Sequence, residues 1–259
     1  MRLEFGPAGI GGVKEAIMNL ESFSRAGLKC AEIAFTYSIY IKKEEAVIIG
    51  KRAKELGISL SIHSPYYVNL NSKEREKREA SKKRILNCCE IGYYLGARKI
   101  VFHCGYYTKS DESSKEETFQ NIKKAVLEMQ KIIKEKKWNS ILCPEIMGKK
   151  NVFGSIEEVS RLVNETGCGF CIDFAHVLAR YGKIEMKSIE ENFPQKEWHC
   201  HFSGIIYGDK GEKRHRDTKK EEWKSLLKQL PKNKEISIIC EAPNPFKDVV
   251  EGLDISKEF

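Results

Sequence analysis

The sequence lacks the features of a membrane or secreted protein. No apolar run approaches the roughly 18 residues that a membrane-spanning helix needs, and the first residues do not form a secretory signal. Low-complexity tracts and linker-like stretches are also missing, and no shift in composition marks a domain boundary. We therefore expect one soluble domain covering residues 1–259, located in the cytoplasm and not associated with membranes.

Disulfide patterns and a strong excess of charge are lacking as well. The nine cysteines are an odd number and lie mostly in apolar, strand-like segments, which is typical of reduced, buried thiols. Cys168 and Cys171 form a Cys-x-x-Cys pair, but no second pair at zinc-ribbon spacing accompanies them, so we interpret both as buried thiols. The formal net charge of +8 suits a polyanionic partner without requiring one.

The chain does contain a regular alternation of strand-like and helix-like segments. Apolar or β-branched runs predict strands at 1–5, 30–35, 58–63, 99–103, 140–145, 169–173, 197–202 and 235–241. Amphipathic segments predict helices at 13–26, 43–56, 74–95, 114–136, 155–165, 218–229 and 245–257, with one or two more within 177–194 and a charged loop at 207–217. Eight units of about 32 residues predict an α/β fold that is a single (β/α)8 TIM barrel, with a doubly wound open sheet as the alternative.

Histidine is scarce, with six residues, yet most of these and several carboxylates end or follow the predicted strands. The positions are His63, His103, Glu145, Asp173, His176, His201, His215 and Glu241. In a parallel barrel all strand carboxyl ends meet at one mouth, so these side chains are expected to converge on one cavity. A single such histidine is usually a hydrogen-bonded core residue. Burying the whole set without cations would cost several kcal/mol per uncompensated charge, so we predict a multinuclear metal site.

The ligand types narrow the choice of metal. Imidazole and carboxylate donors favour Zn²⁺, with Mn²⁺ or Fe²⁺ as alternatives. Glu145, near the middle of the series, is the candidate for a carboxylate shared between two ions. His199, two residues before His201 on one strand, is expected to face inward one layer lower, in a structural role.

Short motifs spanning nearly the whole chain resemble the endonuclease IV family, the apurinic/apyrimidinic endonucleases of DNA repair. The motifs are Phe5-Gly-Pro-Ala-Gly9, His63-Ser-Pro-Tyr-Tyr-Val-Asn-Leu70, Phe102-His-Cys-Gly105, Pro144-Glu145, Cys171-Ile-Asp-Phe-Ala-His176, His201-Phe-Ser203, Arg214-His215 and Glu241-Ala-Pro-Asn244. The ordered set is more specific than any one motif. The chain also resembles, more weakly, the wider group of xylose isomerase-like barrels.

The resemblance implies a TIM barrel with three zinc ions. It assigns His63, His103 and Glu145 to the first ion, and Glu145, Asp173, His201 and Glu241 to the second. His176 and His215 correspond to ligands of the third ion, but Lys213 replaces the family's aspartate two residues before His215. Glu212 or Asp217 could substitute if the loop is reshaped, and Lys213 or Arg214 could supply positive charge if the third ion is absent.

The implied activity is cleavage of double-stranded DNA on the 5′ side of an abasic site by a monomeric enzyme. Glu145 and Glu241 would be the catalytic residues, through the zinc or manganese ions that they hold. Tyr66, Tyr67 and Arg214 would contact the DNA, the tyrosines by filling the gap left by the missing base. Two alternatives stay open: a sugar isomerase or epimerase of the same barrel group, and a DNA-binding protein without catalysis.

Overall fold

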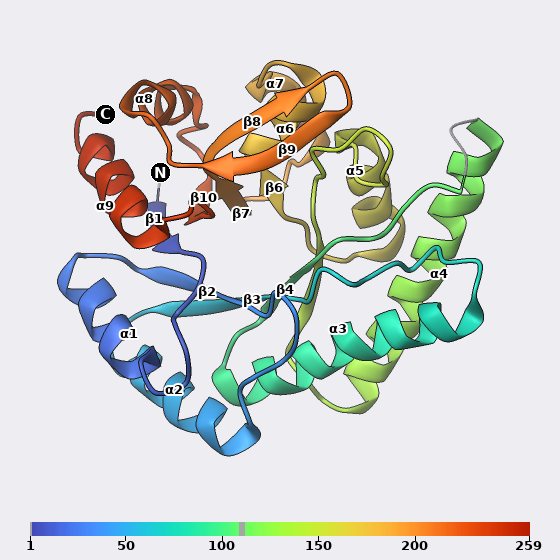
Figure 1. Ribbon diagram of the computed structural model, residues 1–259, viewed down its shortest axis with the longest axis horizontal. Coiled ribbons are helices and arrows are strands. Elements are labelled where there is room, and N and C mark those ends of the chain that lie inside the picture. Colours follow the sequence, from blue (N-terminus) through green and yellow to red (C-terminus); the bar gives the residue numbers. More distant parts are fainter. Residues whose placement is uncertain (1, 109–111) are drawn as a thin grey trace.

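Parallel strands lie at the centre of the molecule, and helices surround them in chain order (Figure 1). The computed structural model describes residues 2–108 and 112–259, so Met1 of the first expected strand lies outside the described residues. The eight central strands are β1 (Arg2–Pro7), β2 (Cys30–Ala34), β3 (Ser59–His63), β4 (Lys99–Phe102), β5 (Ile141–Pro144), β6 (Ile172–Asp173), β7 (Glu197–Phe202) and β10 (Glu235–Cys240).

These strands close on themselves. Hydrogen bonds order them as β1-β10-β7-β6 and β2-β3-β4-β5, with parallel pairing throughout. Parallel bridges from Ala8 to Glu32 and from Glu145 to Cys171 join the two runs at both seams. At the β1–β2 seam a Cβ atom on Gly6 would overlap the carbonyl oxygen of Cys30, so the close approach requires glycine. The predicted (β/α)8 TIM barrel is confirmed, and the open sheet is wrong.

The helices follow the expected positions closely. They are α1 (Ala16–Arg25), α2 (Lys43–Glu55), α3 (Arg75–Leu95), α4 (Glu112–Glu135), α5 (Ile156–Thr166), α6 (Phe174–Tyr181), α7 (Met186–Asn192), α8 (Lys220–Gln229) and α9 (Pro245–Ser256). The weakly patterned region 177–194 holds the end of α6 and all of α7. Helix α6 begins directly after β6 because the side chain of Asp173 caps it, accepting a hydrogen bond from the backbone N–H of His176.

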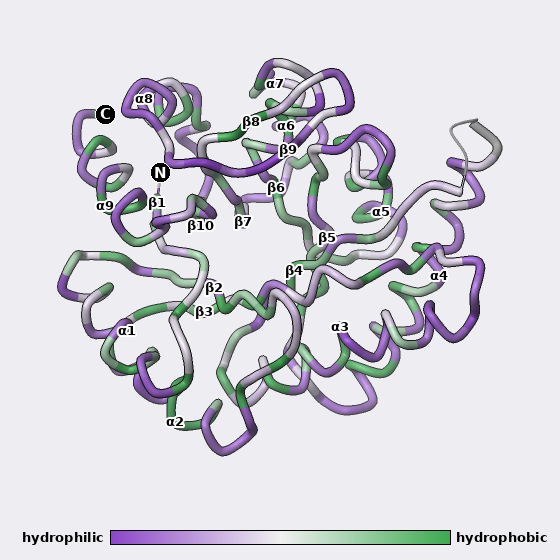
Figure 2. Tube along the Cα trace, viewed as in Figure 1, coloured by the Kyte–Doolittle hydropathy of each residue, from purple (hydrophilic) through white to green (hydrophobic). Residues whose placement is uncertain are grey.

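The expected charged loop at 207–217 is instead most of a β-hairpin. Strands β8 (Gly204–Gly208) and β9 (Gly211–Arg216) pair in antiparallel register. Figure 2 shows β8 as largely hydrophobic and β9 as hydrophilic. Because β9 carries almost no apolar residue, its sequence has no alternating pattern that could predict a strand. Ile205 of β8 is buried against Ala175 and Ala179 of α6, and this contact holds the hairpin over the end of the barrel.

Alternation along the strands separates an apolar layer from a polar barrel interior. Ile62 belongs to the main core between strands and helices, which includes Trp198 and Trp223. Ser61 and His63, on either side of Ile62, instead contact carboxylates of other strands. Since side chains two apart on a strand share a face, the barrel interior is polar up to its carboxyl mouth. Among the residues described, no helix is long and apolar enough to cross a membrane.

Candidate metal centre

A cavity of about 360 Å³ opens at the carboxyl ends of the barrel strands. The predicted ligands that line it are His103, Glu145, His176, His215 and Glu241. The other three, His63, Asp173 and His201, are almost completely buried next to them. Residues that are far apart in the chain therefore meet at one mouth: His63 and Glu241 are separated by 178 positions.

All eight predicted ligands fall into three overlapping groups. In each group, one potential ligand atom from every member lies within 4.8 Å of the others. The groups are His63, His103 and Glu145; then Glu145, Asp173, His201 and Glu241; then Asp173, His176 and His215. The first two are the sets that the resemblance to endonuclease IV implies. The third contains Asp173 together with the two histidines; position 213, where the resemblance implies an aspartate, is a lysine.

Glu145 lies at the centre of these groups. Its Oε2 atom is 3.1 Å from Nε2 of His63 and 3.1 Å from Nε2 of His103. Its Oε1 atom is 3.0 Å from Nδ1 of His176 and 3.6 Å from Nδ1 of His201. Each carboxylate oxygen thus faces a different pair of imidazoles, so Glu145 could contribute a ligand atom to more than one of the groups.

Unpaired buried atoms test whether cations fit this centre. Within the part of the chain that the structure describes, Glu145 Oε1, Asp173 Oδ2, His176 Nε2 and His201 Nδ1 are buried without a hydrogen-bond partner. Leaving a buried polar atom unpaired costs about 1–3 kcal/mol, and more if it is charged. These four atoms are all potential metal ligands, so bound cations would satisfy them at once. The donor set of imidazoles and carboxylates fits Zn²⁺, and the residues present can hold it.

The charges of the centre shift the pKa values of its groups in opposite directions. Burial by itself would raise the pKa of Glu145, but the surrounding histidines hold it well below its usual range. Burial by itself would lower the pKa of His63, but its hydrogen bond to Glu145 raises that pKa to about 9. Burial raises the pKa of Asp173 to about 6. Protonated imidazoles therefore neutralise the buried carboxylates, a role that bound cations would take over.

The floor of the centre contains a residue that the sequence analysis missed, Glu32 of β2. Its Oε1 atom lies 2.9 Å from Nε2 of His201, and its Oε2 atom lies 2.9 Å from Nε2 of His199. Ser61 donates a 2.8 Å hydrogen bond to the same carboxylate. Since Nε2 of His201 faces Glu32, the other ring nitrogen is directed toward Glu145 and Glu241. The available signal was a glutamate flanked on both sides by apolar strand residues, Cys30-Ala-Glu-Ile-Ala34.

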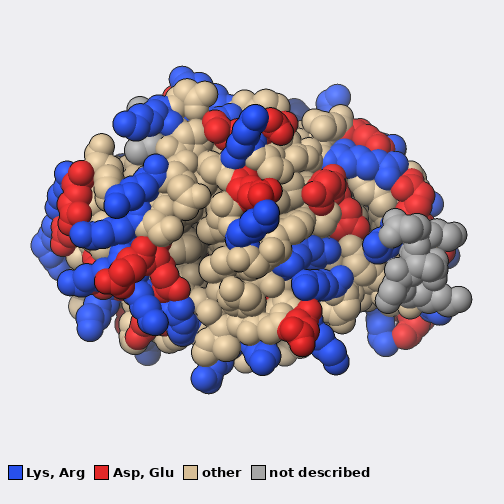
Figure 3. Space-filling model, turned by 90° about the horizontal axis from the view of Figure 1, so that it is seen from above, with Lys and Arg blue, Asp and Glu red and all other residues tan. Residues whose placement is uncertain are grey.

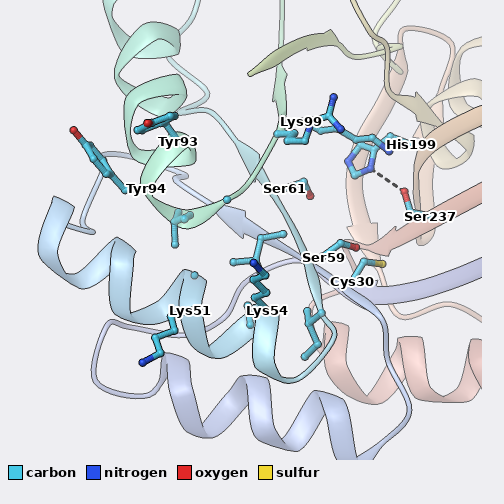
Figure 4. A pocket seen from close by; sticks show the side chains of 17 residues that line it. Cys30, Lys51, Lys54, Ser59, Ser61, Tyr93, Tyr94, Lys99, His199 and Ser237 are labelled. Carbon is cyan, nitrogen blue, oxygen red and sulfur yellow. Dashed lines mark hydrogen bonds between the residues drawn. The ribbon is translucent and has the colours of Figure 1, made fainter. Parts of the chain in front are cut away.

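His199 faces inward and one layer lower, as expected. It is buried, with Nδ1 3.1 Å from the hydroxyl of Ser237, a pair seen in Figure 4. Burial lowers the pKa of His199 to about 4, so the ring is neutral. His199 therefore has a structural role: it connects Ser237 to the carboxylate of Glu32 inside the barrel.

Two tyrosines, Tyr66 and Tyr106, line the cavity, and two more exposed tyrosines precede and follow Tyr66 in the chain. The ring of Tyr66 stacks on that of His103, with centroids 5.3 Å apart and planes 22° apart. Tyr67 is exposed, and its ring lies 6.2 Å from that of Tyr37, which is 74% exposed. Tyr106, not identified from the sequence, lines the cavity and is half exposed. Its place just after β4, close to His103, is the signal that could have found it.

Arg214, the third predicted DNA contact, is exposed but does not line the cavity. It pairs with Ile206, while its neighbour His215 pairs with Ile205, so the two side chains lie on opposite faces of the hairpin. Arg214 thus does not supply charge to the third group of ligands. On the face drawn in Figure 3, basic and acidic side chains are interspersed, without an extended area of one sign.

A larger cavity, of about 580 Å³, lies at the opposite, amino end of the barrel (Figure 4). Lys54, Lys99 and the pair His199–Ser237 line it, and no carboxylate does among the described residues. The basic lining is explained by the carboxyl ends of α2 and α3, whose backbone dipoles favour nearby cations. The smaller cavity, with its mixed donors, is therefore the candidate centre.

The class of this protein is a (β/α)8 barrel with imidazoles and carboxylates clustered at its carboxyl mouth. The chain belongs to the xylose isomerase-like TIM barrel family, whose family model matches residues 20–259. An uncharacterised protein of Methanocaldococcus jannaschii is 33% identical over 260 residues, which cover 93% of this chain and 92% of that protein. A probable endonuclease 4 of Mycobacterium leprae is 29% identical over 126 residues. That match spans about half of each protein, 49% of this chain and 48% of the relative.

Solved structures share the fold at low sequence identity. SacUVDE has a TM-score of 0.75 at 16% identity, covering 100% of this chain and 98% of that one. Endonuclease IV from Thermus thermophilus has a TM-score of 0.68 at 18% identity, with 100% and 98% coverage. D-psicose 3-epimerase from Clostridium cellulolyticum has a TM-score of 0.69 at 15% identity, with 98% of both chains covered. Nucleases and sugar epimerases thus share this barrel, and the site must distinguish between them.

Proposed function

We propose that this protein is a metal-dependent phosphodiesterase of DNA repair, which cleaves the backbone on the 5′ side of abasic sites. The observation that carries the proposal is the set of three overlapping ligand groups around Glu145 and Asp173. The partial similarity to a probable endonuclease 4 supports it. A centre for one or two ions, sufficient for a sugar substrate, would not need the third group.

Each proposed cation corresponds to one group of neighbouring ligand atoms. Zinc is the preferred metal, with manganese as the alternative, because the donors are nitrogen and oxygen only. His63, His103 and Glu145 would hold one ion, and Glu145, Asp173, His201 and Glu241 a second. When bound, such ions supply Lewis-acid stabilisation of a phosphodiester and lower the pKa of water.

The protein's own residues have three tasks in this proposal. Glu145 and Glu241 would act as catalytic residues by holding the two cations in the cavity. Glu32 fixes the ring of His201 from below, since its carboxylate lies 2.9 Å from Nε2. The cavity walls, including the stacked Tyr66, exclude bulk water from the reacting phosphate.

The exposed tyrosines would recognise the lesion. Tyr67 follows the cavity-lining Tyr66 in the chain and forms an aromatic pair with Tyr37, and a missing base leaves a gap that such rings can fill by stacking. Arg214, on the outer face of the hairpin, would contact the phosphate backbone as a positioning charge. The proposed substrate is therefore duplex DNA with a single abasic nucleotide.

Incubation with a duplex that carries one tetrahydrofuran abasic analogue tests the proposal. Zinc-loaded protein should release a single product cut 5′ to the lesion, and chelator should abolish it. An undamaged duplex of the same sequence and the isosteric variant Glu145→Gln are the controls. If the zinc-loaded protein does not cut the lesion duplex, the proposed activity is wrong.

A sugar isomerase or epimerase is the second candidate. The cavity of about 360 Å³ has the size of a small-molecule pocket, and the D-psicose 3-epimerase of C. cellulolyticum shares the fold. The same metal-loaded preparation should therefore be assayed with ketohexoses. Sugar turnover without DNA cleavage would replace the first proposal with this one.

A further inference from the structure

Glu212 lies against one member of the third group of candidate ligands, His176. Its Oε2 atom lies 3.3 Å from Nε2 of His176, and both residues line the cavity. Nδ1 of His176 faces the carbonyl oxygen of Ile146 at 3.0 Å, so Nε2 is the nitrogen left for a ligand. That nitrogen is buried and has no hydrogen-bond partner among residues 2–108 and 112–259. Two ligands of one tetrahedral zinc ion lie about 3.4 Å apart, so the observed spacing fits a shared cation.

A β-bulge explains why the residue at position 212, and not 213, faces His176. The hairpin register runs Ile205–His215, Ile206–Arg214, and then Tyr207–Glu212. Lys213 is the extra residue on β9 and has no cross-strand partner in this register. Because cross-strand partners share a face and successive residues alternate, Glu212 lies on the same face as His215. In a hairpin without the bulge, the residue on the same face as His215 would be the one two positions before it, which is Lys213 in this chain.

The packing of the hairpin brings this face onto α6. Ile205, cross-strand partner of His215, is buried against Ala175 and Ala179, on either side of His176 in the helix. Nδ1 of His215 lies 2.6 Å from the hydroxyl of Ser203, which orients the ring and leaves its Nε2 for a ligand. The rings of His176 and His215 are 5.3 Å apart.

Gly148, in the loop after β5, makes room for the carboxylate. A Cβ atom there would lie 2.7 Å from Cβ of Glu212 and 2.9 Å from Cδ2 of His176. Any other residue would push the two side chains apart. The backbone N–H of Glu212 also donates to the carbonyl oxygen of Gly148 at 3.3 Å, which fixes the end of the hairpin against this loop.

We propose that Glu212 adds a ligand to a third divalent-cation site beside Asp173, His176 and His215, in place of the aspartate that the resemblance implies at the position of Lys213. The inference rests on the proposed metal centre and adds a ligand to it. Asp217, the other acidic residue close to His215 in sequence, is exposed and is not part of the cavity wall. It therefore does not take this role.

Zinc content, measured without any DNA, tests the site. Purified wild-type protein is loaded with zinc and desalted, and bound metal is counted by mass spectrometry and located by anomalous diffraction. Glu212→Gln should lose one ion per chain, with at least tenfold weaker binding at that site and unchanged thermal unfolding of the metal-free protein. Asp217→Asn is the matched control and should keep all three ions. Deletion of Lys213 should also keep three, because a regular hairpin then presents Glu212 two positions before His215.

The outcomes separate this inference from the proposed function. Three ions in wild-type protein and two in Glu212→Gln support it. Three ions in both overturn it, as does loss of the third ion in Asp217→Asn or in a folded Lys213 deletion. Two ions in wild-type protein also overturn it, but leave the Glu145 centre and the proposed nuclease intact. No bound zinc in wild-type protein defeats the proposed function itself.

Discussion

Glu32 Oε1 lies 2.9 Å from Nε2 of His201, on the side of the ring that faces away from Glu145 and Glu241. This carboxylate–histidine contact fixes the orientation of a proposed metal ligand from the barrel interior. Replacement of Glu32 by Gln should therefore weaken zinc binding by about 10–100-fold, as is typical for such outer partners. Isothermal titration of metal-free protein with zinc measures the effect.

The matched control for this variant is Glu235→Gln. Glu235 pairs with Lys196 at the surface, away from the candidate centre. Its replacement should leave zinc affinity unchanged. Equal zinc affinity in Glu32→Gln and wild-type protein would show that the contact does not support a metal ligand.

Removal of metal should lower thermal stability. Cations that bind only the folded state stabilise it by RT ln(1 + [L]/Kd), which is about 2.7 kcal/mol when the ion is at 100 times its Kd. For a chain of this size, that corresponds to a rise in Tm of about 5–10 °C per site. Calorimetry of chelator-treated protein, with and without added zinc, gives the shift. Magnesium, which prefers oxygen ligands, is the control ion and should have much less effect.

Tyr67 should contribute to binding of the lesion and not to metal binding. Tyr67→Ala removes one ring of the exposed pair with Tyr37 and should raise KM for the abasic duplex roughly tenfold, with a smaller change in kcat. Zinc content should stay at the wild-type level. Tyr93→Ala, at another exposed tyrosine lining the cavity at the amino end of the barrel, is the control. A KM equal to that of the wild type would remove Tyr67 from the proposed DNA surface.

The thiols should be inert in the folded protein. All nine cysteines are buried and free. Burial raises the pKa of Cys168 to about 11 and that of Cys89 to about 12, so the thiolate fraction at pH 8 is of the order of 10⁻³ or lower. A thiol-specific reagent should therefore label fewer than one cysteine per chain at pH 8, and nine in denaturant. Raising the pH to 9 should increase the fraction tenfold and still leave it small. Rapid labelling of the native protein would contradict the buried setting.

The main features of the centre were accessible from the sequence because the fold is periodic. Each βα unit brings the chain back to the same mouth, so a histidine or carboxylate at one strand end becomes a neighbour of those at the others. That argument was enough to bring the predicted ligands to one mouth and to suggest Glu145 as the shared carboxylate, whereas their division into groups came from the resemblance to endonuclease IV. The alternation of side chains along a strand also predicted that His199 faces inward, because it lies two residues before His201 and so shares its face.

What the sequence by itself determined was the repeat of strands and helices, and with it the barrel and the imidazoles and carboxylates at its carboxyl mouth. Only the tertiary structure decided which acidic residue of the hairpin faces His176, since a one-residue bulge at Lys213 reverses the direction of every side chain beyond it. Only the tertiary structure placed Glu32 beneath His201, because a single glutamate in an apolar strand does not reveal its partners. Local patterns set the elements, whereas cross-strand register and packing set which side chains meet.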